Sequence, residues 1–504
     1  MIEAVANAFG HILTLKVLLM ILAGLFGGLI SGALPGLTAT MAVALLVPFT
    51  FSMDPTEGLI VLGAIYMACI YGGAFSAILV NTPGTPSSIG TTFDGYPMAK
   101  KGEGEKAILV ATFASVYGGI VGVIFLLFLS PPLANVALRF GPPEYFWMAV
   151  FGVTIISSLA SKNVLKGFLG GAIGLLISTI GIAPIGGDVR FTAGYPPLQG
   201  GIELIVALIG FFCIPEVLTM VTERQKTFHI AETEHRKGLL LKTFVDVMRR
   251  QGNLLRSSII GTVVGILPGA GGSVANLVAY NEAIRVSKTP EKFGTGEVDG
   301  IIATESSNNA VVGGGIIPLV TLGIPGAPPD AILYGVLLIH GLRPGPELFS
   351  MHSEIIFTFI MSLFVATILM LPVGVISGRL LHKTVVRIPI RFLAPVIFFL
   401  TIIGSYAIRN NITDVYIMLT LGVIGYALKR LEFHPGPITL GLILGPIGEM
   451  GFVQALLMGQ MLPNKWMIFF NRPLSWVLII LSLFSLFWPL FIKKIAKGWK
   501  IKEM

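Results

Sequence analysis

Long charge-free runs of apolar residues alternate with short polar segments along most of the chain. The longest runs cover residues 17–53, 58–93, 107–138, 145–161, 167–187, 257–281, 306–329, 355–378, 392–408 and 473–492. A helix that crosses a bilayer needs about 20 apolar residues, so several runs hold one span and the first two are long enough for more. Shorter runs at 204–215, 415–428 and 433–448 bring the expected number of spans to about a dozen. The pattern predicts an all-α polytopic membrane protein.

The composition excludes the main soluble classes. Of 504 residues, 54% are hydrophobic and 12% charged, whereas an ordinary soluble domain carries about 25% charged residues. A soluble enzyme, a disordered chain and a nucleic-acid binder are therefore excluded, because the net charge of +8 comes from loops between apolar runs. The two cysteines, Cys69 and Cys213, are too few for a disulfide framework or a multi-thiolate metal site.

Loop charges predict the orientation of the chain. The apolar stretch after Lys16 runs on to Met53, longer than the core of a signal peptide, so we expect an uncleaved first span. Basic residues cluster in residues 222–256, in 379–391 and in the C-terminal tail. Lys and Arg next to spans mark the cytoplasmic side, so the sequence predicts that the 222–256 loop and the C-terminus are cytoplasmic.

The chain resembles itself across the central basic loop. Residues 27–36 read GGLISGALPG and residues 260–269 read IGTVVGILPG. Further on, Gly72-Gly73 recurs as Gly314-Gly315, and the Pro-Gly-x-Pro motif at 83–86 recurs at 325–328. We therefore expect a first membrane repeat at 1–221, a basic cytoplasmic linker at 222–256, and a second repeat at 257–504 with C-terminal spans and a basic tail.

The two copies carry opposite loop charges. The loop between the motifs is acidic in the first copy, with Asp54 and Glu57, and basic in the second, with Arg285, Lys288 and Lys292. Equivalent loops should then lie on opposite sides of the membrane, as in the inverted-topology repeats of many transporters, whose substrate binds near the midplane.

Each copy contains two Pro-Gly interruptions within apolar sequence. Proline removes a backbone donor and glycine favours non-helical angles, so we expect broken or re-entrant helices at Pro35, Gly36, Pro83, Pro86, Pro268, Gly269, Pro325 and Pro328. Irregular backbone at membrane depth persists only when it is buried in protein or lines a wet cavity. A simple kink is the alternative for the first motif of each copy.

Small polar residues and glycines gather around these breaks. An intramembrane polar cluster is a functional-site hypothesis by default, although helix-packing hydrogen bonds are an alternative. We expect substrate or cation binding by Thr38, Thr40, Asn81, Thr82, Gly84, Thr85, Ser87, Ser88, Ser273, Asn276, Ser306, Asn308, Asn309 and Gly326. Their oxygens suit a hard cation, and a Na⁺ ion is expected at Asn81, Thr82, Ser306 and Asn308.

Several kinds of chemistry have no motif in the chain. The sequence contains no P-loop and no H-E-x-x-H, so we expect no catalytic residue and no cofactor besides a coupling cation, Na⁺ or H⁺. Glu305 and Asp94 are either proton- or cation-binding groups or ordinary solvated carboxylates at helix ends. Since no Lys or Arg occurs between Lys16 and Lys100, an anion held by the first copy needs backbone amides, hydroxyls and bound cations.

Three stretches carry a family resemblance: GALPGLTATMAVALLVPFTF at 32–51, VNTPGTPSSIGTTFDGYPMAKKGEG at 80–104 and ATESSNNAVVGGGIIPLVTLGIPGAP at 303–328. They resemble the large membrane subunit of tripartite tricarboxylate transporters, the TctA type. The resemblance implies a permease of the bacterial inner membrane that works with a small four-span membrane subunit (TctB-like) and a periplasmic solute-binding protein (TctC-like). It also implies secondary import of carboxylates such as citrate, driven by a Na⁺ or H⁺ gradient.

Other functions remain open from the sequence. Another small organic anion taken up by the same mechanism is one alternative, and a passive channel is an alternative of a different class. A membrane enzyme would need a charged or nucleophilic constellation near one interface, and the sequence offers none.

Overall fold

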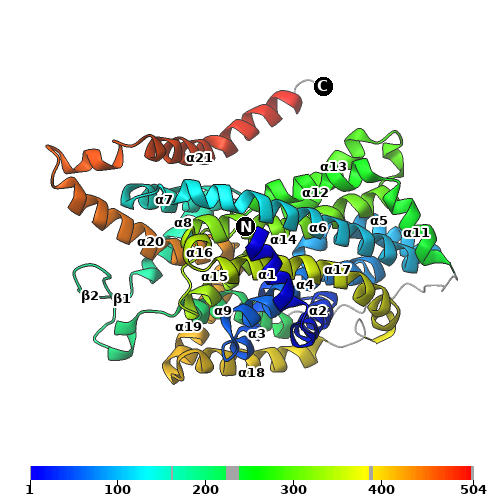
Figure 1. Cartoon of the computed structure of the whole chain (residues 1–504), viewed down its shortest axis with the longest axis horizontal. Helices are drawn as coiled ribbons and strands as arrows, with labels where there is room; N and C mark the ends of the chain where they lie inside the picture. The colour runs from blue at the N-terminus through cyan, green and yellow to red at the C-terminus, as the bar shows by residue number, and fades with distance from the viewer. Residues whose placement is uncertain (1, 160–162, 223–237, 385–389, 501–504) are drawn as a thin grey trace. The chain divides into compact units, whose positions relative to one another are not determined.

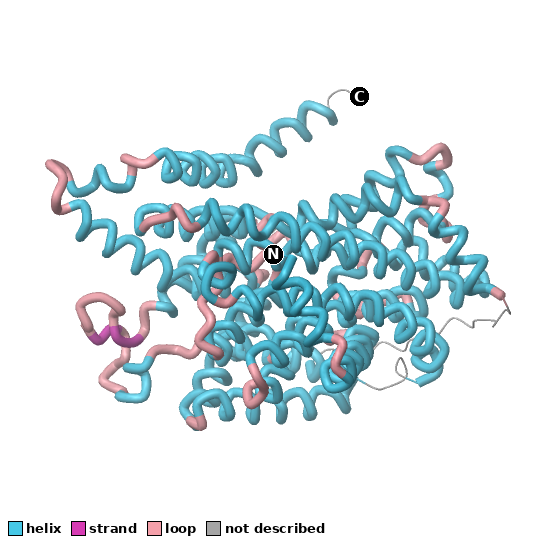
Figure 2. The backbone as a smooth tube through the Cα atoms, viewed as in Figure 1, coloured by secondary structure: helices cyan, strands magenta, loops and turns pink. Residues whose placement is uncertain are grey.

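The chain is helical almost throughout (Figure 2). The computed structural model describes all residues except 1, 160–162, 223–237, 385–389 and 501–504. Among the described residues the strands are one antiparallel pair, β1 (Gly181–Ile182) with β2 (Val189–Arg190). The helices fall into two compact units, one of residues 1–134 and 212–410 and the other of residues 135–211 and 411–504. These units follow packing and are discontinuous in sequence, unlike the repeats expected at 1–221 and 257–504.

The first unit contains both Pro-Gly motifs of each copy. Its elements are α1 (Ile2–Ile12), α2 (Leu15–Ala33), α3 (Ala39–Thr50), α4 (Pro55–Val80), η1 (Pro86–Ser88), α5 (Thr91–Met98), η2 (Ala99–Glu103), most of α6 (Gly104–Ala137), α10 (Ile214–Thr222), α11 (Leu239–Met248), α12 (Gln251–Ile266), α13 (Gly271–Val286), η4 (Pro290–Lys292), α14 (Val298–Leu322), α15 (Pro328–Ile339), α16 (Glu347–Met351), α17 (Ser353–Thr384) and α18 (Ile390–Arg409) (Figure 1).

The second unit is built around α20. Its elements are α7 (Pro142–Leu159), α8 (Val164–Ser178), the two strands, η3 (Pro196–Gly200), most of α9 (Leu204–Phe212), α19 (Ile412–Arg430), α20 (Pro435–Gly459), η6 (Lys465–Phe469) and α21 (Pro473–Lys500). Helix α20 packs against α7 and α8. The buried Glu144 of α7 accepts hydrogen bonds from Arg472 and Ser475, both at 2.6 Å, which ties the start of α21 to α7.

Seven helical stretches among the described residues are long and apolar enough to cross a bilayer. They are Leu15–Ala33, Pro55–Val80, Thr91–Ala137, Leu204–Thr222, Ser353–Gly378, Ile412–Arg430 and Pro435–Gly459. Shorter apolar helices accompany them, α3, α8 and α15 among them. The prediction of an all-α polytopic membrane protein is confirmed at this level.

Helix α14 differs from the sequence expectation. The charge-free run predicts a span beginning at residue 306, whereas the helix begins at Val298 and includes Asp299 and Glu305. Almost every residue of α14 is buried, Glu305 included. The start of the charge-free run does not mark the start of α14, because the helix continues through Glu305, whose carboxylate is buried inside the protein. The described part of the basic linker is likewise helical, forming α11 and the first turns of α12.

Glycines bring the helices of the first unit into backbone contact. A methyl group added at Gly28 of α2 would lie 2.3 Å from the carbonyl oxygen of Ile65 in α4. In the same way, Gly261 of α12 faces the carbonyl oxygen of Ser307 in α14 at 2.2 Å, and Gly118 of α6 faces that of Ser306 at 2.0 Å. Small residues are the usual means by which membrane helices approach closely. Helix α14 is therefore held between α12 and α6 by backbone contact.

The Gly28 contact generates a stability prediction. Gly28→Ala forces α2 away from α4 and should destabilise the protein by about 1–3 kcal/mol, the usual cost of overpacking. Gly27→Ala on the same helix is the matched control, because nothing lies within 4 Å of the added methyl group. Thermal denaturation of the purified variants in detergent should show a lower midpoint for Gly28→Ala alone, and equal midpoints would contradict the packing described here.

Candidate functional site

The first Pro-Gly motif of each copy lies between two helices. Helices α2 and α12 end in the same way, with Leu34 and Leu267 extended and each backbone N–H donating to the carbonyl three residues earlier. Gly36 and Gly269 then take φ angles of 92° and 82°, which strongly favour glycine. The chain resumes as α3 and α13. Pro35 and Pro268 thus separate helices instead of kinking one, so the simple-kink alternative does not describe them.

The second motif of each copy also follows a long helix. Helix α4 is capped by Asn81, with φ of 56°, and α14 is capped by Gly323, with φ of 70°. We call residues 81–88 the first tip and residues 323–328 the second tip. The first tip contains Pro83 and Pro86 and ends in η1, while the second contains Pro325 and leads at Pro328 into α15.

Three glycines meet behind each tip. A methyl group added at Gly84 would lie 2.0 Å from the carbonyl oxygen of Gly32 and 3.0 Å from Cα of Gly73. In the second copy, one added at Gly326 would lie 2.5 Å from the carbonyl oxygen of Gly265 and 2.6 Å from Cα of Gly315. The residues that match in sequence thus occupy matching positions. A side chain at Gly84 would push the first tip away from α2 and α4, and one at Gly326 would push the second tip away from α12 and α14.

The first tip of one copy contacts α13 of the other. Asn276 of α13 accepts a hydrogen bond from the backbone N–H of Gly90 at 2.8 Å and donates to the carbonyl of Thr304 at 3.3 Å. Gly272, in the first turn of α13, lies against both Ser87 and Asn308. The helix of the second tip, α15, correspondingly packs against α3 of the first copy. Each tip region is therefore enclosed by a helix of the opposite copy.

The expected hydroxyl groups of the first tip form a buried cluster. The Thr85 hydroxyl lies 3.0 Å from that of Ser87 and 3.0 Å from that of Ser88, and all three side chains are nearly inaccessible. Asn81 is exposed and Thr82 is half-buried, with its hydroxyl donating to the carbonyl of Val80. The tip therefore has a buried inner side, which can contact a ligand through hydroxyls, and an open outer side.

Two polar residues of α14, Asn308 and Asn309, contact α4. Asn308 donates to the carbonyl of Ile70 at 3.4 Å and Asn309 to that of Met67 at 3.5 Å. Both side chains are fully buried, and neither Oδ1 atom has a hydrogen-bond partner. Carbonyl oxygens of this kind suit hard cations, so the pair provides buried atoms that could ligate one. Ser306 instead donates within its own helix, to the carbonyl of Ile302.

Thr82, Ser306 and Asn308, three of the residues expected to bind Na⁺, each donate a hydrogen bond to a backbone carbonyl. Among the described residues, no hydrogen bond joins Asn81 or Thr82 to Ser306 or Asn308, while Gly272 brings Ser87 close to Asn308. Thr38 accepts from the backbone N–H of Met41 and so caps α3, and Thr40 is buried in that helix. Ser273 is half-buried in the first turn of α13.

Glu305 and Asp94 are buried and not solvated, so the solvated alternative does not hold for either. Glu305 accepts hydrogen bonds from Thr91 and, at 2.9 Å, from Ser115. Asp94 accepts from the backbone N–H groups of Gly296 and Glu297, both at 2.8 Å, and from the Tyr280 hydroxyl. Asp94 is thus engaged in fixing the loop before α14, whereas Glu305 is held by hydroxyl groups alone, without a basic partner among the described residues.

Sequence reasoning missed the residues that complete this site. Thr91 and Ser115 carry no motif, and only folding brings them to Glu305. Asp330 follows the second tip and is fully buried. A signal for it was available, because Asp330 is offset from Ser88 by the same 242 residues that separate the two Pro-Gly-x-Pro motifs.

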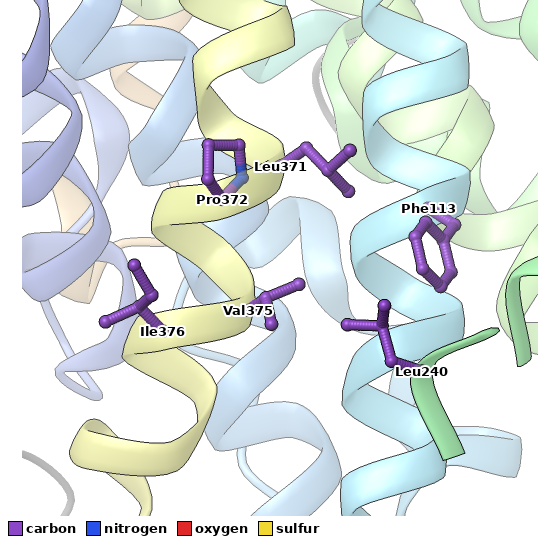
Figure 3. A pocket seen from close by; sticks show the side chains of 6 residues that line it. All are labelled: Phe113, Leu240, Leu371, Pro372, Val375 and Ile376. Carbon is purple, nitrogen blue, oxygen red and sulfur yellow. The ribbon is translucent and has the colours of Figure 1, made fainter. Parts of the chain in front are cut away.

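A hollow of about 310 Å³ lies elsewhere in the first unit (Figure 3). It is lined by apolar side chains of α6, α11 and α17: Phe113, Leu240, Leu371, Pro372, Val375 and Ile376. Figure 3 shows Phe113 and Leu240 across from Leu371 and Val375. With no polar atom on its walls, this hollow offers nothing to recognise an anion or a cation, and the tips remain the candidate site.

The chain is similar in sequence to two known proteins and matches one family model. A protein of Agrobacterium vitis, an uncharacterized 52.8 kDa protein in the TAR-I ttuC' 3' region, is 35% identical over 465 residues, which is 91% of this chain and 90% of that protein. A second, an uncharacterized protein in the TAR-II ttuC' 3' region of the same organism, is 33% identical over 223 residues, 44% of this chain and 90% of that protein. The family model of the tripartite tricarboxylate transporter TctA family matches residues 18–440. The chain is therefore a member of the TctA family, the large membrane subunit of a tripartite transport system.

Proposed function

We propose that this chain is the permease of a binding-protein-dependent secondary transporter that imports small carboxylates, a tricarboxylate such as citrate first, by symport with Na⁺. The observation that carries the proposal is the pair of non-helical tips, each enclosed by a helix of the opposite copy and lined by hydroxyls, amides and backbone groups. Membership in the TctA family supports the same function. A small membrane subunit and a periplasmic binding protein complete the proposed system.

The proposed arrangement is an inverted repeat in the bacterial inner membrane. The matching glycine contacts behind the two tips support two structurally equivalent copies. The opposite charges of their equivalent loops support opposite orientation, with the 222–256 loop and the C-terminus in the cytoplasm. Residues 223–237 and 501–504 of these segments lie outside the described residues.

Charge balance favours symport over passive conduction. A carboxylate in a site of low dielectric constant needs compensation, and among the described residues no Lys or Arg takes part in the contacts of either tip. Helix N-termini supply only about half a unit charge each, so even two of them would offset no more than about one charge. A citrate-like anion therefore requires cations bound with it, and the free oxygens of Asn308 and Asn309 are suitable ligands for one of them.

Transport by reconstituted protein tests this function directly. Proteoliposomes that contain both membrane subunits, supplied with the binding protein and radiolabelled citrate, should accumulate citrate only under an inward Na⁺ gradient. Equal gradients of K⁺ and of H⁺ are the controls. Uptake that needs no ion gradient, or conductance in the absence of the binding protein, would refute symport.

Substrate and cation should promote each other's binding. Because the anion is neutralised in part by bound Na⁺, its affinity should rise steeply with Na⁺ concentration, and Na⁺ affinity should rise with citrate by the same factor. Calorimetric titration of the purified protein at constant ionic strength and several Na⁺ concentrations measures both. Affinities that do not change with Na⁺ would mean that a basic side chain supplies the charge.

Thr85→Val should impair transport without unfolding the protein. The substitution keeps the shape of the side chain and removes the hydroxyl that lies between Ser87 and Ser88. Loss of a hydrogen bond to a charged ligand should lower citrate uptake about tenfold or more. Thr92→Val is the matched control, because the Thr92 hydroxyl donates only to the nearby carbonyl of Ile89. Wild-type uptake by Thr85→Val, at equal amounts of protein in the membrane, would remove this cluster from the site.

A further inference from the structure

The two tips differ in charge at one equivalent position. Ser88 in the first copy corresponds to Asp330 in the second. A methyl group added at Gly73 would lie 2.3 Å from the Ser88 hydroxyl, and one added at Gly315 would lie 2.3 Å from Oδ2 of Asp330. The two side chains thus occupy the same place over matching glycines, but one is neutral and the other is a carboxyl group.

Asp330 uses one oxygen to close the second tip. Its Oδ2 atom accepts a hydrogen bond from the backbone N–H of Ala327 at 2.7 Å, and the N–H of Gly326 lies near the carboxylate. These are the amides that precede α15, a helix of 12 residues. The N-terminal end of α15 therefore already holds a carboxylate of the protein itself, and without a bound cation it does not attract a substrate anion.

The other oxygen of Asp330 lacks a partner. The side chain is fully buried, its Oδ1 atom makes no hydrogen bond, and no ion pair among the described residues includes it. The hydroxyl of Tyr66 lies beside the carboxylate. Two backbone carbonyls of neighbouring helices, Gly265 of α12 and Gly315 of α14, lie against Gly326 of the second tip. Gly265 stands in the last turn of α12, where the dipole of a helix favours positive charge.

We propose that Asp330, together with the carbonyls of Gly265 and Gly315 behind the second tip, is a Na⁺ site whose occupancy makes this tip able to accept the substrate carboxylate. The carboxylate contributes one negative charge and the N-terminus of α15 offsets about half of it, so the empty tip repels an anion. Bound Na⁺ reverses the sign of the net charge. The first tip has the neutral Ser88 at the equivalent position and therefore needs no bound cation to remove a negative charge.

This inference rests on the proposed symport for its purpose, but its test does not require transport. Binding of ²²Na⁺ is measured on the purified full-length chain in nanodiscs, without substrate and at constant ionic strength. Asp330→Asn should weaken Na⁺ binding about 10- to 100-fold, because a charged ligand becomes neutral. Asp54→Asn is the matched control, since Asp54 also accepts from a backbone amide at a helix N-terminus, at 2.9 Å, but is exposed.

Asp330→Ser, which introduces the residue found at the equivalent position of the first tip, is a second variant and should weaken Na⁺ binding by the same factor. Should both variants fail to fold, the wild-type protein still decides the matter. Dicyclohexylcarbodiimide modifies buried carboxyl groups, and peptide mass spectrometry reports the extent at each residue. Na⁺, but not K⁺, should slow modification of Asp330. Unchanged Na⁺ affinity in folded variants, or equal modification rates with and without Na⁺, would overturn the proposal, whichever solute the protein transports.

Discussion

The arrangement of this protein depends on burying irregular backbone inside a membrane protein. Hydrocarbon offers no hydrogen bonds, so a non-helical tip persists only where protein or water satisfies its polar groups. Here glycines permit that enclosure: Gly32, Gly73 and Gly84 meet in one copy, and Gly265, Gly315 and Gly326 meet in the other. Backbone then lies directly against backbone. The candidate site exists because these contacts hold each tip against its two long helices.

The same close packing explains why α14 can be polar. Helices α12 and α6 approach it through Gly261 and Gly118, while Asn308 and Asn309 bond to carbonyls of α4. Enclosed on several sides by protein, α14 contacts helices instead of lipid. Its carboxylate and amides are therefore shielded from hydrocarbon, where they would be costly. Close backbone packing thus allows α14 to carry a buried carboxylate and buried amides.

Equivalent structure in the two copies does not mean equivalent chemistry. The tips share their glycine contacts and their helix ends, but Thr85 and Ser88 bond to each other in the first copy, whereas Asp330 binds the tip's own amides in the second. The proposed symport would need two kinds of ligand atom, for an anion and for a cation, in one enclosed region. A duplicated scaffold with diverged tip residues supplies both, and the backbone geometry is preserved.

The sequence by itself determined that the chain is an all-α membrane protein and located its helix breaks at the Pro-Gly motifs. Lone prolines such as Pro48 and Pro318 remain inside helices, because a kinked helix can satisfy its freed carbonyl locally, whereas proline followed by glycine also relaxes the backbone. Only the tertiary structure decided which polar residues meet. Glu305 with Ser115, and Asn276 with Gly90, are separated by 190 and 186 residues in the chain, and no local pattern encodes such a contact. The charge-free run begins eight residues after the start of α14, because the run stops at Glu305 while the helix does not. The sequence around Glu305 could not show that this carboxylate is buried, since its hydrogen-bond donors, Thr91 and Ser115, come from distant segments.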